Sequence, residues 1–170
     1  RTAGTYTLKV NSRGNNNFVK ASVLNNPTSM SPYSITASFT LTGSETSKSV
    51  TLTPATYTST LEGAAFNIFD QIVNANDFLR ANTGCATLGN ICTSVSVAPK
   101  VRVFWTAGLS PGAYYGSSTS AISFYIANDE SAYGMATGMY IMGGINGSTC
   151  VDTDHFDNSV IVHEYGHFLE

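Results

Sequence analysis

The sequence predicts an α+β fold, with a β-rich segment over residues 1–60 and a mixed part of helices and strands over residues 61–170. Polar and apolar residues alternate in the first segment, which is typical of half-buried strands. A wide apolar face with helical spacing begins near Leu61, and a second helical pattern ends the chain. A chain of 170 residues fits one domain and is long enough to bury a core.

Strands are expected wherever alternation is bounded by turn-forming residues. They cover residues 5–10, 18–24, 33–41, 49–52, 100–105, 121–126 and 138–144. Glycines in the last of these strands allow a bulge or the close approach of another backbone.

Two helices are expected. The first begins at Ala64 and should be buried over much of its circumference. Five residues share one face of it at helical spacing: Phe69, Ile72, Val73, Asn76 and Leu79. The second should run from about Phe156 to the end of the chain, with Asp154 or Asp157 as its N-terminal cap.

The composition excludes several classes of partner. Only 11% of the residues are charged, the net charge is -3, and there is no basic run. We therefore expect neither a nucleic acid nor an anionic membrane as a partner. No apolar run approaches the ~18 residues that a membrane span requires. Hydroxyl and amide side chains replace charged ones, which favours an extracellular location, secreted or at the cell surface.

The three cysteines give a weaker indication. Cys85 and Cys92 flank a six-residue loop, and a local disulfide between them is expected, with two unrelated buried thiols as the alternative. Their spacing does not match the usual metal knuckle, C-x₂₋₄-C. Cys150 is either free or paired with a cysteine beyond residue 170.

The sequence ends with the motif H-E-x-x-H, formed by His163, Glu164 and His167. On a helix, residues four apart are neighbours, so the two imidazoles can bind one metal ion. Glu164 is rotated by about 100° from His163, beside the open coordination position, where it can take a proton from a metal-bound water. The sequence therefore predicts a zinc site with His163 and His167 as ligands and Glu164 as the catalytic residue.

The alternative is a solvated, charged end of an amphipathic helix. The apolar neighbours of the motif argue against it, because they predict that this helix is mostly buried. These neighbours are Val160, Ile161, Val162, Phe168 and Leu169. Gly166 has no side chain, so another element can pack closely there.

Other polar residues near the motif have simpler explanations. His155 is expected to be an ordinary surface histidine, with a supporting role at the metal as the alternative. Helix capping explains Asp152, Asp154 and Asp157 more simply than a calcium site does. Glu170 shares a face with His163 but lies one turn beyond the metal position. Three tyrosines fit either a substrate cleft or the interior of a sheet: Tyr114, Tyr115 and Tyr140.

The motif and the order of elements resemble those of the zincin metallopeptidases, and the run 154–167 is similar to that of secreted bacterial members with a β domain in front. The resemblance implies a zincin-like upper subdomain over 61–170, with a backing helix at 64–81, a twisted mixed sheet and an active-site helix. It makes 138–144 or 121–126 the edge strand that pairs with substrate. It also implies Zn²⁺ as the cofactor and Glu164 as the general base.

Two departures from the family bear on the function. Glu170 stands where the metzincin branch has glycine, and the gluzincin branch takes a glutamate from a later helix. We therefore expect the third zinc ligand in a missing C-terminal portion. The leading hypothesis is a secreted zinc endopeptidase that hydrolyses proteins or peptides, of which this chain is a fragment with little activity alone. The alternatives are a non-catalytic surface or adhesion module with a vestigial metal motif, and a zinc hydrolase of non-peptide substrates.

Overall fold

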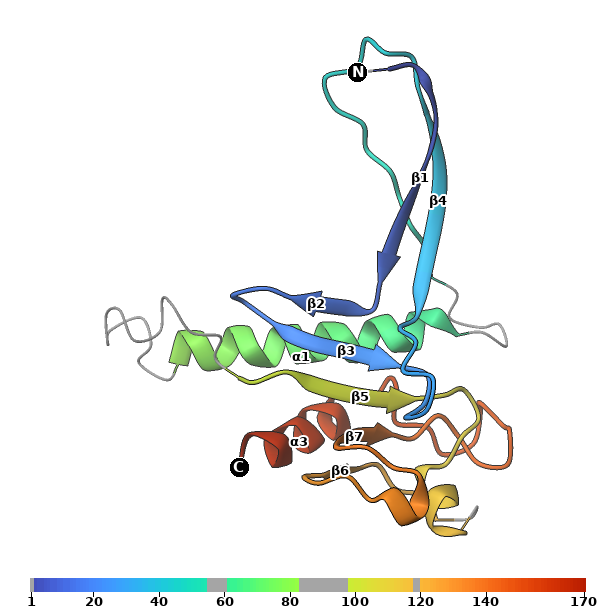
Figure 1. The fold of residues 1–170 in the computed structure, drawn as a ribbon, viewed down its shortest axis with the longest axis vertical. Coiled ribbons are helices and arrows are strands. Elements are labelled where there is room, and N and C mark those ends of the chain that lie inside the picture. The colour runs from blue at the N-terminus through green and yellow to red at the C-terminus, as the bar shows by residue number, and fades with distance from the viewer. Residues whose placement is uncertain (1, 55–60, 83–97, 118–119) are drawn as a thin grey trace.

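The computed structural model describes residues 2–54, 61–82, 98–117 and 120–170. In this part of the chain two α-helices and a mixed β-sheet form the body of the molecule, and a two-stranded ribbon extends from it (Figure 1). The expected α+β class is confirmed at this level.

The main sheet has five strands in the order β2-β3-β5-β7-β6. Their bounds are β2 Arg13–Asn15, β3 Lys20–Leu24, β5 Val101–Trp105, β7 Gly138–Ile141 and β6 Phe124–Ile126. The three central strands are parallel, and each outer strand is antiparallel to its neighbour. Because β2 and β3 come from the first 60 residues, the sheet crosses the boundary expected near residue 60.

Strand β5 shows how alternation divides the two faces of the sheet. Val101, Val103 and Trp105 point into the larger apolar core, whereas Phe104 joins a smaller cluster on the opposite face. Arg102 is exposed. Successive side chains of a strand point to opposite faces, so one strand contributes to both layers.

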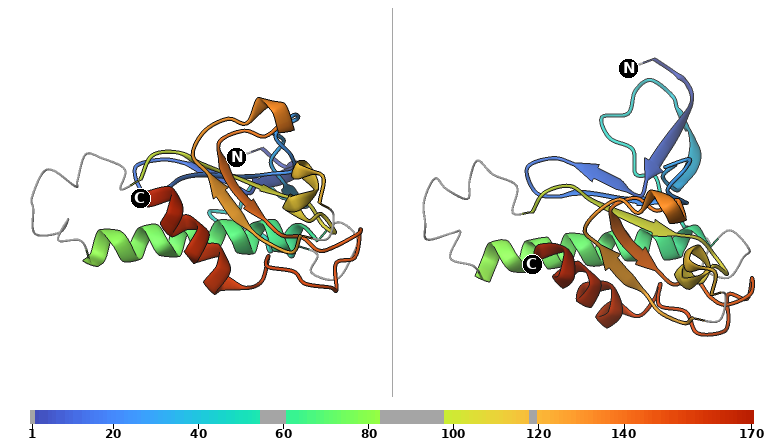
Figure 2. Two further views of the ribbon diagram at one scale, coloured as in Figure 1. Left: turned by 90° about the horizontal axis from the view of Figure 1, so that it is seen from below. Right: turned by 60° about the horizontal axis from the view of Figure 1, so that its bottom comes forward.

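Helix α1 (Glu62–Asn82) and helix α3 (Asn158–Leu169) lie on the same face of this sheet (Figure 2). Ile68, Ile72 and Asn76, spaced four apart on α1, are buried. This spacing places them on one stripe of the helix, which faces the core. The helix expected at 64–81 is confirmed, with two extra residues at its start and one at its end.

The opposite face of the sheet is covered by the connections around β6. Leu24, Phe104, Ile126, Met135 and Tyr140 form its buried cluster. Two short 3₁₀ helices lie in these connections: η1 Pro111–Tyr115 and η2 Ser131–Tyr133. Both faces of the central strands are therefore buried, as is usual for parallel strands.

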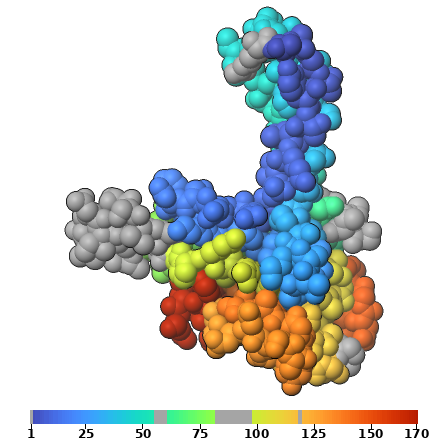
Figure 3. Space-filling view, viewed as in Figure 1, coloured from blue at the N-terminus to red at the C-terminus, as the bar shows by residue number. Residues whose placement is uncertain are grey.

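Strands β1 (Gly4–Asn11) and β4 (Ser34–Leu41) pair with each other and project from the body as an arm (Figure 3). Their alternation separates an apolar face, where Tyr6 stacks on Phe39, from a face rich in hydroxyl groups. The prediction of a strand at 49–52 is wrong, because these residues pair with no other strand among the described residues.

Two glycines allow backbones to approach each other closely, as expected for the segment 138–144. A Cβ atom on Gly138 would lie 2.6 Å from the carbonyl oxygen of Arg102, and one on Gly143 would overlap the carbonyl oxygen of Thr106. Side chains at these positions would therefore push β7 and the turn after it away from β5.

Candidate metal centre

The motif helix α3 begins directly after an aspartate cap. The carboxylate of Asp157 accepts hydrogen bonds from the backbone N–H groups of Ser159 at 3.0 Å and Val160 at 3.3 Å. A helix leaves such donors unpaired at its start, and the cap satisfies them. Capping by Asp157 is thus confirmed, and the helix begins at Asn158 rather than near Phe156.

The two imidazoles of the motif converge. The Nε2 atoms of His163 and His167 are 3.1 Å apart, and their ring centroids are 4.6 Å apart. Two nitrogen ligands at ~2.0–2.1 Å from a tetrahedral zinc ion are about 3.3–3.4 Å apart. The separation of the two Nε2 atoms is therefore close to that of two ligands of one zinc ion.

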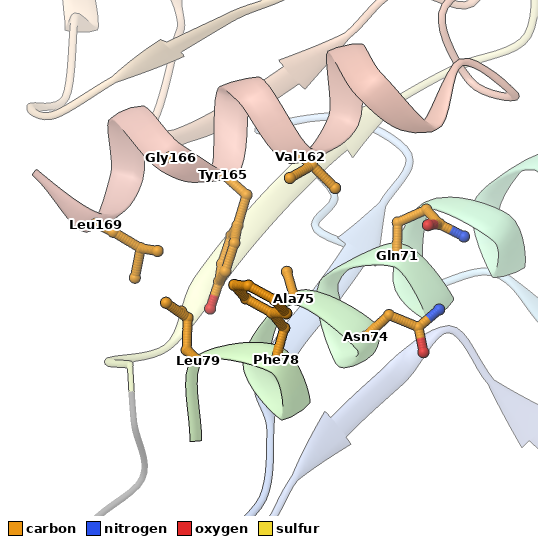
Figure 4. A pocket seen from close by; sticks show the side chains of 9 residues that line it. All are labelled: Gln71, Asn74, Ala75, Phe78, Leu79, Val162, Tyr165, Gly166 and Leu169. Atoms are coloured by element: carbon orange, nitrogen blue, oxygen red, sulfur yellow. The ribbon is translucent and has the colours of Figure 1, made fainter. Parts of the chain in front are cut away.

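Both imidazoles are open to solvent, which differs from the expectation of a mostly buried helix. On α3 only Ile161, Glu164 and Tyr165 are buried. Val162 and Leu169, counted as core residues from the sequence, are 44% and 40% exposed. They line an open hollow between α3 and α1 (Figure 4) instead of packing in the core, so apolar character alone overestimated the burial of this helix.

Glu164 lies in a different environment from its neighbours, because it is only 6% exposed. Burial raises the pKa of its carboxyl group above the ordinary value, and the electrostatic interaction with the neighbouring His163 and His167 opposes that shift. The negative charge of Asp154 raises the pKa further, and a hydrogen bond from the backbone of Tyr125 lowers it. A buried carboxylate with a raised pKa, beside two imidazoles, is a typical general base.

Tyr125 belongs to β6, which resolves the position of the edge strand. β6 pairs with β7 only and ends the sheet, whereas β7 lies between β5 and β6. Of the two predicted candidates for the edge strand, the segment 121–126 contains it, and the prediction that placed it at 138–144 is wrong. Phe168 of α3 packs against Tyr125 with ring centroids 5.8 Å apart, so the motif helix is held beside this edge.

A groove of about 570 Å³ separates the motif helix from the approach to β6. We call it the acidic groove. The residues that line it are Ala121, Ile122, Ser123, Asp154, Ser159, Val160, His163 and Glu164. It thus contains the first imidazole, the buried glutamate and a second carboxylate.

Asp154 ties the two walls of the acidic groove together. The hydroxyl of Ser123 donates to its Oδ2 at 2.6 Å, and the backbone N–H of Met142 donates to the Ser123 hydroxyl at 2.9 Å. The backbone N–H of Asp154 donates to the carbonyl of Met142 at 3.0 Å. Sequence reasoning missed Ser123 and Tyr125, since their roles depend on residues more than 15 positions away.

The described residues offer two candidate metal ligands, and no third candidate lies beside them. No group of three His, Cys, Asp or Glu side chains able to hold a metal occurs in this part of the chain. Glu170 Oε2 lies 3.7 Å from Nδ1 of His167, on the side of the ring away from the Nε2 pair, and its side chain is 82% exposed. It can orient that ring as a carboxylate partner.

The expectation that His155 lies on the surface is wrong. It is only 2% exposed and packs between Trp105 and Phe156, with ring centroids 5.4 and 4.8 Å away. Burial lowers its pKa below the ordinary value, opposed by a hydrogen bond to the backbone of Met142 and by the charge of Asp154. His155 therefore supports the loop before α3 as a neutral core residue.

The three tyrosines considered for a substrate cleft do not line the acidic groove. Tyr140 is buried in the smaller core, where its hydroxyl bonds the backbone of Ala136. Tyr114 packs edge-on against Tyr140, and Tyr115 donates a hydrogen bond to Glu130 at 2.8 Å. The interpretation as residues packed around the sheet is thus favoured for Tyr114 and Tyr140.

A second hollow lies between the two helices, on the other side of α3 (Figure 4). It has a volume of about 410 Å³ and is mostly apolar, with Phe78 of α1 65% exposed at its rim. Gly166 lines it, and no described atom lies within 4 Å of where its Cβ would be. Close packing against Gly166 is therefore not found among the described residues.

One of the three cysteines lies in the described part of the chain. Cys85 and Cys92 lie outside the described residues, and Cys150 is exposed and forms no disulfide within the described part of the chain.

None of the described helices is long and apolar enough to cross a bilayer.

Comparison of the chain with models of known protein families, with curated proteins and with solved structures found no match.

Proposed function

We propose that this chain carries the ligand helix and the general base of a zinc-dependent endopeptidase of the zincin type that acts outside the cell. One observation carries the proposal. Two imidazole Nε2 atoms converge at 3.1 Å on a helix whose buried glutamate faces the edge of a mixed sheet. Metal ligands, base and substrate edge are the three parts that such a peptidase requires.

His163 and His167 would hold the metal, which when bound polarises a peptide carbonyl and acidifies water. Glu164 accepts the proton of the attacking water and then donates it to the leaving amine. Its raised pKa suits both steps, because a carboxylate that is too weak a base would not take the proton. Glu170 would orient the His167 ring through Nδ1.

The open edge of β6 would bind the substrate backbone. An extended peptide can add to this edge as a further strand, through main-chain hydrogen bonds. Such a peptide would run along the acidic groove and past Glu164. Catalytic zinc sites take three protein ligands and one water, so the third ligand is expected from outside the described residues.

The test uses the full-length protein and compares three forms. Wild type should bind one zinc ion, measured by elemental analysis after dialysis, and cleave casein. Glu164→Gln should keep the metal but lose about 10²–10⁴-fold in rate, because only the base is removed. His163→Gln should lose both the bound zinc and the cleavage of casein.

Two results would refute the proposal. One is wild-type protein without bound zinc in a metal-replete preparation. The other is casein cleavage that survives both substitutions.

The β1–β4 ribbon favours a second candidate, a non-catalytic surface or adhesion module. Its hydroxyl-rich face and its arm-like projection suit binding to another molecule (Figure 3). A zinc-loaded protein that cleaves no protein substrate, yet still binds a surface ligand through the ribbon, would establish this alternative.

A further inference from the structure

The acidic groove holds two carboxylates and no lysine or arginine among its lining residues. Glu164 has a role in the proposed reaction, whereas Asp154 has none. A carboxylate in a groove lined by no lysine or arginine is available to pair with a cationic side chain of a bound ligand.

Asp154 is also held in place. Its Oδ2 receives the Ser123 hydroxyl at 2.6 Å, and its backbone N–H bonds the carbonyl of Met142. These contacts fix the carboxylate between the start of the edge strand and the end of β7. The side chain is partly exposed and lines the groove. A preorganised carboxylate at the wall of a groove binds a cation with little loss of side-chain freedom.

We propose that Asp154 is a specificity-determining residue, which selects protein substrates with a lysine or arginine side chain close to the scissile bond. The inference rests on the proposed peptidase function. A peptide bound along β6 would pass both Asp154 and Glu164, because both residues line the same groove. A cationic side chain there would pair with Asp154.

Two substitutions separate the charge of Asp154 from its structural role. Asp154→Asn removes the charge but keeps an oxygen that can accept the Ser123 hydrogen bond. Ser123→Ala removes the hydrogen bond but keeps the charge. A purely structural role predicts similar effects of both variants, whereas charge selection predicts an effect of the first alone.

The experiment uses the zinc-loaded full-length protein. Cleavage sites in a denatured protein mixture are mapped by mass spectrometry, and kcat/KM is then measured for peptide pairs that differ by lysine against norleucine. We expect a basic residue at one fixed position near the cleaved bond. Its replacement by norleucine should lower kcat/KM on the order of fivefold, as for a partly exposed ion pair. Asp154→Asn should abolish that ratio and Ser123→Ala should retain it.

A binding measurement does not depend on catalysis. In Glu164→Gln, Asp154 is the one carboxylate left among the groove-lining residues. Fluorescence anisotropy should show tighter binding of the lysine peptide than of the norleucine peptide, with and without a chelator. The ratio should fall toward one in 0.5 M salt and in the double variant with Asp154→Asn.

The outcomes distinguish the two proposals. Cleavage without preference for basic residues, or a preference that Asp154→Asn leaves intact, overturns this inference while the peptidase function stands. If the zinc-loaded protein cleaves no peptide, the peptidase function fails and the inference fails with it. If Asp154→Asn does not fold, the salt dependence and the lysine preference of the wild type still decide, since absence of either contradicts the role of the charge.

Discussion

A hydrogen bond between the two helices should contribute measurably to stability, because both of its partners are buried. Asn76 of α1 donates from Nδ2 to the hydroxyl of Tyr165 at 2.7 Å, and the two residues are 2% and 1% exposed. Tyr165 directly follows Glu164 in the motif. This bond therefore fixes the rotation of α3 about its own axis. Burial raises the pKa of Tyr165 to about 12, and the phenol stays neutral at assay pH.

The expected magnitudes follow from the partners that each substitution leaves behind. Tyr165→Phe removes the hydroxyl, but Asn76 keeps its bond to the carbonyl of Ile72 at 3.0 Å, so the loss should be about 1 kcal/mol. Asn76→Ala leaves the Tyr165 hydroxyl buried without this donor and opens a small cavity, which should cost about 2–3 kcal/mol. The double variant should lose less than the sum, by about 1 kcal/mol.

Urea unfolding at neutral pH measures these differences. The single tryptophan, Trp105, is buried and reports the transition by fluorescence, with circular dichroism as the second probe. The midpoint should move while the slope stays constant. The bond does not join the helices if Tyr165→Phe lies within about 0.5 kcal/mol of wild type, the low end of what a hydrogen bond contributes, and the double variant is additive.

Three further predictions concern single positions near the motif. The unfolding free energy should fall as pH drops from 7.5 to 5.5, because burial lowers the pKa of His155 in the folded state and the unfolded chain therefore binds one more proton. His155→Asn should reduce this dependence on pH, measured by urea unfolding. Gly166→Ala should raise stability by about 0.5–1 kcal/mol, since its Cβ meets nothing, whereas Gly143→Ala should lower the melting temperature sharply. Asp157→Ala should lower the urea midpoint and Asp157→Asn should not, as only the second retains the cap; equal losses would contradict the capping role.

Local patterns predicted both helices and most strands, because these depend on neighbouring residues, but they missed β2 and wrongly placed a strand at 49–52. The spacing of Ile72 and Asn76 indicated α1, and alternation indicated β1, β4 and β5. The pairing of β3 with β5 was not predicted. It joins residues about 80 positions apart, with α1 between them, and no periodicity within either strand carries that information.

The environment of His155 illustrates a second limit. A histidine in a polar run of aspartates is typical of a surface loop, yet this one is covered by Trp105 and Phe156. The tryptophan comes from β5, and its position over the loop depends on how the sheet packs. Burial of an isolated polar residue in a loop is therefore decided by distant elements, and the sequence of the loop does not reveal it.

The same distinction divides the candidate site. The Nε2 separation of 3.1 Å between His163 and His167 depends on helical spacing, so the motif alone predicted it. The raised pKa of Glu164 has another origin, because burial beside β6 and the charge of Asp154 produce it, and both come from outside the helix. A solvent-exposed helix with the same five residues would keep the paired imidazoles but lose the environment of the base. The pairing of the two imidazoles is thus encoded locally, whereas the proposed catalysis requires the sheet edge, and a motif match without that edge supports only the proposal of metal binding.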